Sequence, residues 1–120
     1  MVVGLMALIT FGCGDNNTPS ETIDKLFQLT QENNCQEVAD LVTDTRPKLA
    51  DRYVNDCKQI AERLVSYSIK GETIDGNGLI AKVDLEVTIE ENSVEKTNFV
   101  TRFLVKRGDD WKLTEIENRE

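Results

Sequence analysis

The first half of the chain carries hydrophobic residues at helical spacing. Apolar side chains return every three or four positions after Pro19, which predicts an amphipathic helix with one buried face. Thr18 and Glu21 are placed to form a capping box at its start. Similar stripes predict a short second helix and a third helix that opens at Pro47 and could be interrupted at residues 55–56. The apolar residues of the three helices are Ile23, Leu26 and Phe27, then Val38, Leu41 and Val42, then Leu49, Tyr53, Ile60, Ala61 and Leu64.

After Leu64 the hydrophobic period changes from helical to alternating, the pattern of strands with one buried and one solvated face. Val65, Tyr67 and Ile69 share one face of a first strand, and a second, longer strand spans residues 79–90. Two more are expected over residues 94–106 and 111–116, with turns at 75–78, 91–93 and 108–110. Helices followed by an antiparallel four-stranded meander predict an α+β fold.

Composition narrows the classes of function. The 120 residues suffice for one domain with one hydrophobic core. A formal charge of -8 repels phosphate backbones, so no nucleic-acid partner is expected. The sequence has no histidine, the side chain used most often as a general base and as a metal ligand. We therefore expect a protein that is not an enzyme and that holds no metal or cofactor.

An uncharged apolar run precedes the predicted helices. Residues 2–11 are apolar except for Thr10, a length that suits an export signal better than the roughly 20 residues of a membrane-spanning helix. The end of this run, Ile9 to Gly12-Cys13, resembles the lipobox of bacterial lipoproteins, with a departure at Thr10. In those proteins the cysteine receives a diacylglycerol on its sulfur and becomes the mature N-terminus.

The lipobox resemblance implies a division of the chain into three parts. Residues 1–12 would be a signal peptide, residues 13–18 a lipidated Cys13 with a short tether, and residues 19–117 a single domain. The protein would be exported and anchored by lipid to a bacterial membrane, on its periplasmic or outer face. The alternative is a buried N-terminal strand or helix in which Cys13 is an ordinary core residue.

With Cys13 set aside, Cys35 and Cys57 remain as an even pair in a compartment that permits disulfides. A bridge between them would close a loop of about 20 residues and attach the third helix to the start of the second. The alternative is two separately buried thiols.

The order of three helices and a curved meander, ending in Gly-Asp-Asp-Trp-Lys-Leu, is similar to the nuclear transport factor 2-like superfamily. Within it, the chain resembles small bacterial lipoproteins that carry a domain of unknown function. The likeness covers residues 18–116 and implies a cone, with helices packed into the concavity of a bent sheet and a pocket, or the remnant of one, at the open end. That superfamily includes isomerases, cyclases, dehydratases and binding domains, so the fold does not give the function.

Aromatic side chains are the candidates for lining such a pocket. They are Tyr53, Tyr67, Phe99, Phe103 and Trp111, with Thr101 and Arg102 as polar contacts. The alternative is that these aromatics form the core. Arg102 would need an anionic partner if its face of the strand were covered. We expect that face to be solvated, with Arg102 a surface charge.

These observations lead us to expect a membrane-anchored, non-enzymatic envelope lipoprotein. Its cone-shaped domain would bind a partner protein or a small apolar ligand. One alternative is a small isomerase or dehydratase that uses a buried carboxylate, although the strand register places the acids from Asp84 to Glu90 outside. The other is an inhibitor or immunity-type protein.

Overall fold

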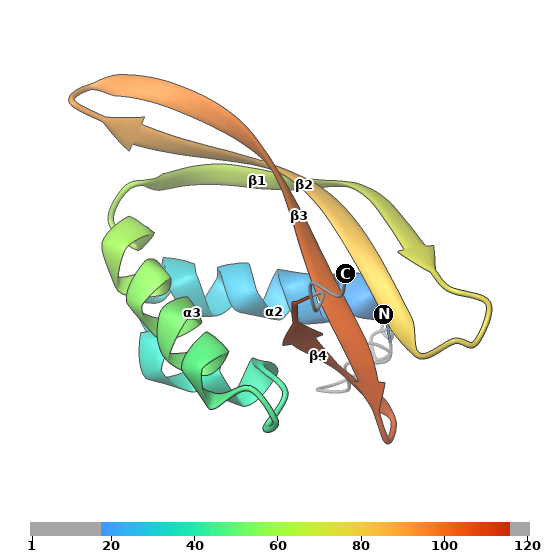
Figure 1. Ribbon diagram of the computed structural model, residues 1–120. Coiled ribbons are helices and arrows are strands. Elements are labelled where there is room, and N and C mark those ends of the chain that lie inside the picture. The colour runs from blue at the N-terminus through green and yellow to red at the C-terminus, as the bar shows by residue number, and fades with distance from the viewer. Residues whose placement is uncertain (1–17, 116–120) are drawn as a thin grey trace, which may run out of the picture.

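A computed structural model describes residues 18–115 of the chain. Cys13, the apolar run before it and Ile116 lie outside the described residues. The elements follow the expected order, helices and then strands, and the α+β fold is confirmed (Figure 1). They are α2 (Pro19–Gln31), the 3-10 helix η1 (Cys35–Leu41), α3 (Pro47–Ile60), β1 (Leu64–Ile74), β2 (Ile80–Glu91), β3 (Val94–Arg107) and β4 (Asp110–Thr114).

Helix α2 begins where its sequence signals predicted. The backbone N–H of Glu21 donates to Thr18 Oγ1 over 3.1 Å, and the N–H of Thr18 donates to Glu21 Oε1 over 3.3 Å. The capping box therefore satisfies donors that the first helical turn leaves unpaired. Ile23, Leu26 and Phe27 are buried on the face that meets the sheet.

The second helix was predicted to stop near residues 43–44, and the third to continue to Leu64; both end earlier. Element η1 stops at Leu41 because the chain turns extended at Val42, which forms a parallel bridge with Leu113 of β4. Helix α3 is continuous through residues 55–56, so the break that the sequence allowed there is absent, and the helix ends at Ile60. Leu64, which we had placed in this helix, opens strand β1 instead.

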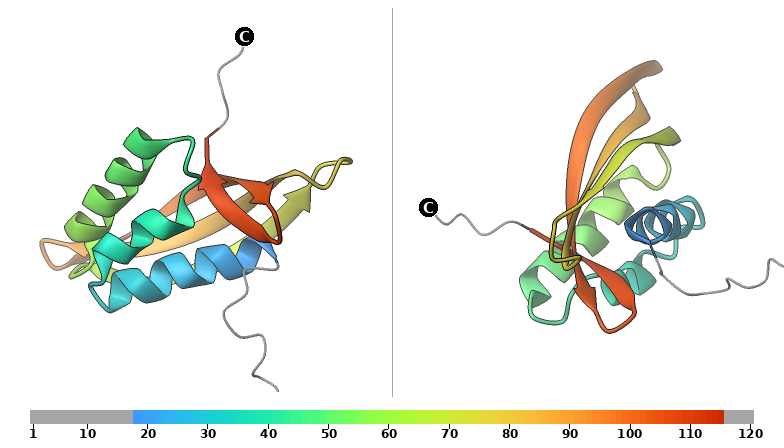
Figure 2. Two further views of the ribbon diagram at one scale, coloured as in Figure 1. Left: turned by 90° about the horizontal axis from the view of Figure 1, so that it is seen from below. Right: turned by 90° about the vertical axis from the view of Figure 1, so that its right-hand side faces the viewer.

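The four strands form one antiparallel meander in the order β1-β2-β3-β4. The β2–β3 hairpin turns at Asn92 and Ser93, whose φ angles of 54° and 67° are those of a tight two-residue turn. All helices lie on one side of the sheet, and the long strands curve over them (Figure 2). This arrangement leaves the other face of the sheet uncovered by any described element.

Two register shifts interrupt strand β1. The first leaves Val65 without a partner on β2, so Val65 is exposed and does not share the buried face that we had predicted for it. The second falls between Ile69 and Gly71, and it brings Glu72 opposite Val83 on the helix side. There the Glu72 carboxylate accepts hydrogen bonds from the N–H and the hydroxyl of Ser20, at 3.0 and 2.6 Å.

The core lies between the inner face of the sheet and the helices. Its fully buried members include Ile23, Val38, Val83, Leu85, Leu104 and Leu113. Alternate residues of β2 point inward, as the sequence pattern predicted. Successive side chains of a strand point to opposite faces, so every second residue faces the helices and its neighbours face the other side of the sheet. No helix in the described part of the chain combines the length and the apolar composition that crossing a bilayer requires.

The expected disulfide is present. Cys35 and Cys57 are bonded with a Cα–Cα distance of 5.6 Å, and both are buried. The bond joins the start of η1 to the last turn of α3. It therefore holds the connection between the helices against the core, and the alternative of two separate thiols is excluded.

Candidate functional site

A pocket of about 160 Å³ lies between the concave face of the sheet and helices α2 and α3. Its wall is mainly apolar, and its apolar side chains include Leu26, Phe27, Ile60, Leu85, Val87 and Val100. Its polar members include Tyr53, Asp56, Asn98 and Arg102. Because Asp56 and Asn98 are exposed, they mark the side on which the pocket meets solvent.

Arg102 lies on the inner face of β3, contrary to our expectation of a solvated face. It is opposite Val83 in the β2–β3 register, between the inward-facing Val100 and Leu104. Leu104 is 0% exposed, so the same alternation carries Arg102 toward the helices. Its guanidinium carbon lies 5.4 Å from the centre of the Tyr53 ring, within the range of a cation–π contact.

Tyr53 presents its ring to Arg102 from α3. Burial raises the pKa of the Tyr53 phenol above its ordinary value of 10.0, and the neighbouring Arg102 guanidinium offsets part of that shift. Asp56 and Glu115 add to the rise in this pKa. Tyr53 therefore enters the pocket as a neutral phenol at physiological pH, able to donate or accept a hydrogen bond.

Tyr67 supports the pocket wall from β1. Its ring stacks on that of Phe27, with centroids 4.3 Å apart, and its hydroxyl donates a 2.7 Å hydrogen bond to Asp24 Oδ1. Burial and the hydrogen bond to Asp24 raise the pKa of Tyr67 to about 12. Tyr67 thus acts on the pocket through Phe27, which is a wall residue.

Three of the predicted pocket residues, Phe99, Thr101 and Phe103, do not line this pocket, and their assignment to it is corrected. Thr101 and Phe103 border a second groove instead. Phe99 lies opposite Glu86 and is 77% exposed, while Thr101 donates a 2.8 Å hydrogen bond to Asp84 Oδ1. Phe103 lies opposite Lys82. These three residues alternate with Val100, Arg102 and Leu104, which face the helices. Because β3 has apolar residues on both faces, our prediction assigned the wrong face to the inside.

Trp111 is a core residue, the alternative that the sequence had left open. It is 2% exposed, its carbonyl accepts a 2.8 Å hydrogen bond from the Thr22 hydroxyl, and the Lys106 ammonium lies 5.6 Å from its ring. Of the residues that the sequence offered for a pocket, Tyr53 and Arg102 line this one. No signal in the sequence marked Asn98 as a pocket residue. The helical and alternating periods had marked the wall residues of α2 and β2 as buried, but not as part of a pocket.

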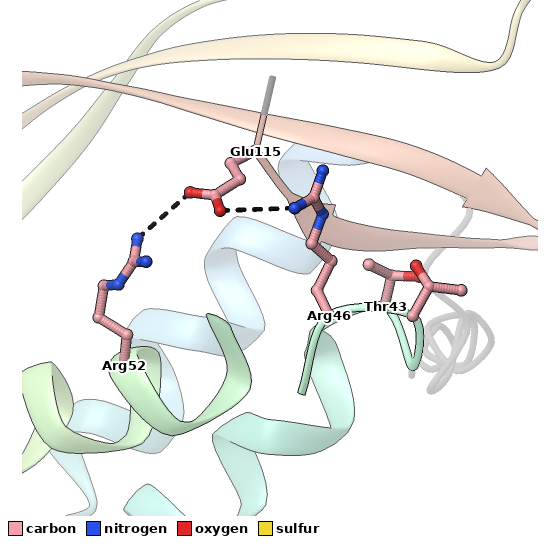
Figure 3. A network of polar contacts seen from close by, with 5 residues as sticks. Thr43, Arg46, Arg52 and Glu115 are labelled. Atoms are coloured by element: carbon pink, nitrogen blue, oxygen red, sulfur yellow. Dashed lines mark hydrogen bonds and ion pairs between the residues drawn. The ribbon is translucent and has the colours of Figure 1, made fainter. Parts of the chain in front are cut away.

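A second, more polar groove adjoins the pocket and shares Tyr53, Asp56 and Arg102 with it. Glu115 borders this groove and forms ion pairs with Arg52 at 3.2 Å and Arg46 at 3.7 Å (Figure 3). Both pairs are partly exposed, so each is worth about 0–1 kcal/mol. The two cations on the helix side nevertheless compensate the charge of Glu115.

Metal ligation has no candidate in the described residues. Over residues 18–115 no three His, Cys, Asp or Glu side chains are gathered closely enough to hold an ion. The acids Asp84 and Glu86 stand on the outer face of β2, as their position in the alternation predicted.

Comparisons with known proteins establish the fold. No family model matches the sequence, and no curated protein matches it. The solution structure of a SEC-C motif containing protein from Rhodopseudomonas palustris is similar with a TM-score of 0.71 at 12% identity, covering 88% of this chain and 82% of that one. A crystal structure of a SEC-C motif containing protein from Psychrobacter arcticus gives 0.69 at 9% identity, covering 84% and 60%.

A designed nuclear transport factor 2-like protein is also similar, with a TM-score of 0.58 and 16% identity over 82% of this chain and 93% of that chain. This likeness supports the cone-like description of helices packed into a curved sheet. At these identities the comparisons concern the fold alone, and the pocket between helices and sheet is the feature from which a function can be argued.

Proposed function

We propose that this protein is an exported lipoprotein, anchored to a bacterial membrane through Cys13, whose cone-shaped domain binds a small apolar ligand without transforming it. The observation that carries the proposal is the apolar pocket between α2, α3 and the sheet. Concave, mostly apolar sites with a few convergent polar groups are the usual form of small-molecule sites. The pocket has both properties.

Two features support the lipid anchor. The Cys35–Cys57 disulfide is typical of proteins that fold outside the reducing cytosol. The sequence contains three cysteines, so the disulfide leaves Cys13 as the remaining one, next to the lipobox-like Gly12. Two or three acyl chains on Cys13 would hold the domain at a membrane, since each buried methylene contributes about 0.8 kcal/mol.

The placement of the acids favours binding over catalysis. The isomerase or dehydratase alternative calls for a carboxylate buried in the pocket beside a tyrosine. Asp56 follows Tyr53 by one helical turn and lines the pocket, but it is exposed to solvent. Asp24, the hydrogen-bond partner of Tyr67, is exposed as well. Neither acid is therefore the buried carboxylate that this alternative requires.

Metabolic labelling with a fatty acid tests the anchor in a bacterium that expresses the full chain. Label should appear on the wild-type protein and be lost in Cys13→Ser. The variants Cys35→Ser and Cys57→Ser are the matched controls, because they remove a cysteine without removing the proposed acylation site. Label that persists in Cys13→Ser would refute the lipoprotein assignment.

Nuclear magnetic resonance with toluene as probe tests the pocket. Toluene is close to the pocket in size, so the methyl signals of Leu26, Val87 and Val100 should shift as it is added. Val100→Phe should abolish the shifts because the larger side chain fills the pocket, and Phe99→Ser on the opposite face should retain them. An absence of shifts in the folded wild-type protein would contradict ligand binding.

Binding of a partner protein is the second candidate function, and one observation outside the pocket favours it. Phe99, Ile80 and Val94 are exposed apolar residues of the β2–β3 hairpin. If a partner binds there, cross-linking in intact cells should give an adduct that Phe99→Ser weakens and Val100→Phe leaves unchanged. An inhibitor or immunity-type protein would act in this way, by binding a partner protein.

A further inference from the structure

We propose that the ligand of the pocket is a small carboxylate whose apolar body is about the size of one aromatic ring, and that Arg102 binds its carboxylate. This inference rests on the proposed ligand-binding function and names the chemical class of the ligand.

The first argument is the position of Arg102. Its side chain leaves the sheet on the helix side, between Val100 and the fully buried Leu104. A cation on a largely apolar surface loses hydration and needs an anion or other acceptors in return. The Arg102 guanidinium lies over the face of the Tyr53 ring. Among residues 18–115 no carboxylate forms an ion pair with it.

The second argument is the contrast with three other arginines, Arg46, Arg52 and Arg63, each of which is paired with a carboxylate. Arg52 is paired with Glu115 at 3.2 Å, and Arg63 is paired with Glu91 at 2.7 Å. Glu115, one of the two acids that border the adjoining groove, is already shared between Arg52 and Arg46. Arg102 therefore keeps its hydrogen-bond donors available on the pocket side, while the Tyr53 ring restricts the plane of its guanidinium.

The third argument is the size of the pocket. Its volume of about 160 Å³ is close to that of an engineered cavity, roughly 150 Å³, that holds a benzene molecule. The apolar wall suits one ring or a short aliphatic chain, and Arg102 stands among its polar members. A planar guanidinium binds a carboxylate through two parallel hydrogen bonds, so the ligand would be oriented as well as held.

Asp56 should lower the affinity of the pocket for a carboxylate ligand. This exposed acid also lines the pocket, and its charge repels a carboxylate. Because it lies on the solvent side, the repulsion is screened, and its removal should strengthen binding by a few-fold. Asp56→Asn is therefore predicted to act in the opposite direction to loss of the Arg102 charge.

The test compares 3-phenylpropanoate with 3-phenylpropanamide, a neutral ligand of nearly the same shape, by calorimetry on the folded domain with its disulfide intact. The carboxylate should bind about 10- to 100-fold more tightly than the amide, the range expected for hydrogen bonds between charged groups. Arg102→Gln should reduce the affinity for the carboxylate to that for the amide and leave the affinity for the amide unchanged.

Matched variants separate charge from folding. Arg102→Lys should retain part of the preference for the carboxylate, and Arg52→Gln should retain all of it, because Arg52 is engaged by Glu115. Binding of the amide to Arg102→Gln shows that the pocket of that variant is intact. If Arg102→Gln were unfolded, two other variants would test the role of Arg102. A reduced preference for the carboxylate in Arg102→Lys and an increased preference in Asp56→Asn would support it, and an unchanged preference in both would contradict it.

The outcomes distinguish this inference from the function on which it rests. Equal affinity of the wild-type protein for the two ligands would overturn the role of Arg102 and leave the apolar pocket standing as a binding site. An equal loss of both ligands in a folded Arg102→Gln would do the same. If neither these ligands nor toluene bind the wild-type protein, the proposed function fails and this inference with it.

Discussion

The hydroxyl of Tyr67 donates a 2.7 Å hydrogen bond to Asp24, joining strand β1 to helix α2. The same side chain stacks its ring on Phe27, one helical turn further along α2. Since Phe27 is part of the pocket wall, the pair Tyr67–Asp24 fixes the distance between the sheet and the helix that together enclose the site.

This contact predicts a loss of stability at alkaline pH. Burial and the bond to Asp24 raise the pKa of Tyr67 to about 12, above its ordinary value of 10.0. The folded state therefore favours the neutral phenol, so the contribution to stability is complete below about pH 10 and disappears as the pH rises through about 12. In urea unfolding across this range, Tyr67→Phe should lose less stability than the wild-type protein. Parallel curves for the two proteins would contradict the assignment.

The disulfide predicts a large effect on stability. It closes a segment with a sequence separation of 22 residues, for which loop-closure entropy gives roughly 3 kcal/mol. The double variant Cys35→Ala/Cys57→Ala should lower the free energy of unfolding by about that amount, as measured by urea denaturation. Cys13→Ser is the control, and the folded domain should keep its full stability in that variant.

Two buried threonines provide a matched pair. Thr22 is 0% exposed and donates a 2.8 Å hydrogen bond to the carbonyl of Trp111, whereas Thr30 donates to Leu26 within its own helix. Thr22→Val leaves the Trp111 carbonyl without this donor and should cost about 1–3 kcal/mol. Thr30→Val should cost less, because the Leu26 carbonyl already accepts the helical N–H bond. Equal costs in thermal or urea unfolding would contradict the cross-element role of Thr22.

The two faces of the sheet predict opposite responses to loss of an aromatic ring. Phe99→Ser should change the free energy of unfolding by no more than about 0.5 kcal/mol, because the ring is exposed on the outer face. Trp111→Ala should cost about 3–5 kcal/mol, because it empties a core position. A strongly destabilised Phe99→Ser would restore our first assignment of Phe99 to the inner face.

Those features of the fold that depend on neighbouring residues could be predicted from the sequence. The capping box of Thr18 and Glu21 set the start of α2, and strict alternation set which residues of β2 point inward. Both signals are local, since a cap or a strand period is read over a few consecutive residues. The even pair Cys35 and Cys57 was predicted as well, because it followed from counting cysteines.

The tertiary structure alone decided the pocket. Strand β3 has apolar residues on both faces, so its own sequence could not show whether Phe99 or Arg102 faces the helices. The pairing of Arg102 with Val83, which is fully buried on the helix side of the sheet, decided the matter. Likewise the extra residue at Val65 appears only when β1 is paired with β2. Periodicity along a chain determines which residues share a face, but the face that becomes the inside depends on contacts between strands and helices distant in sequence.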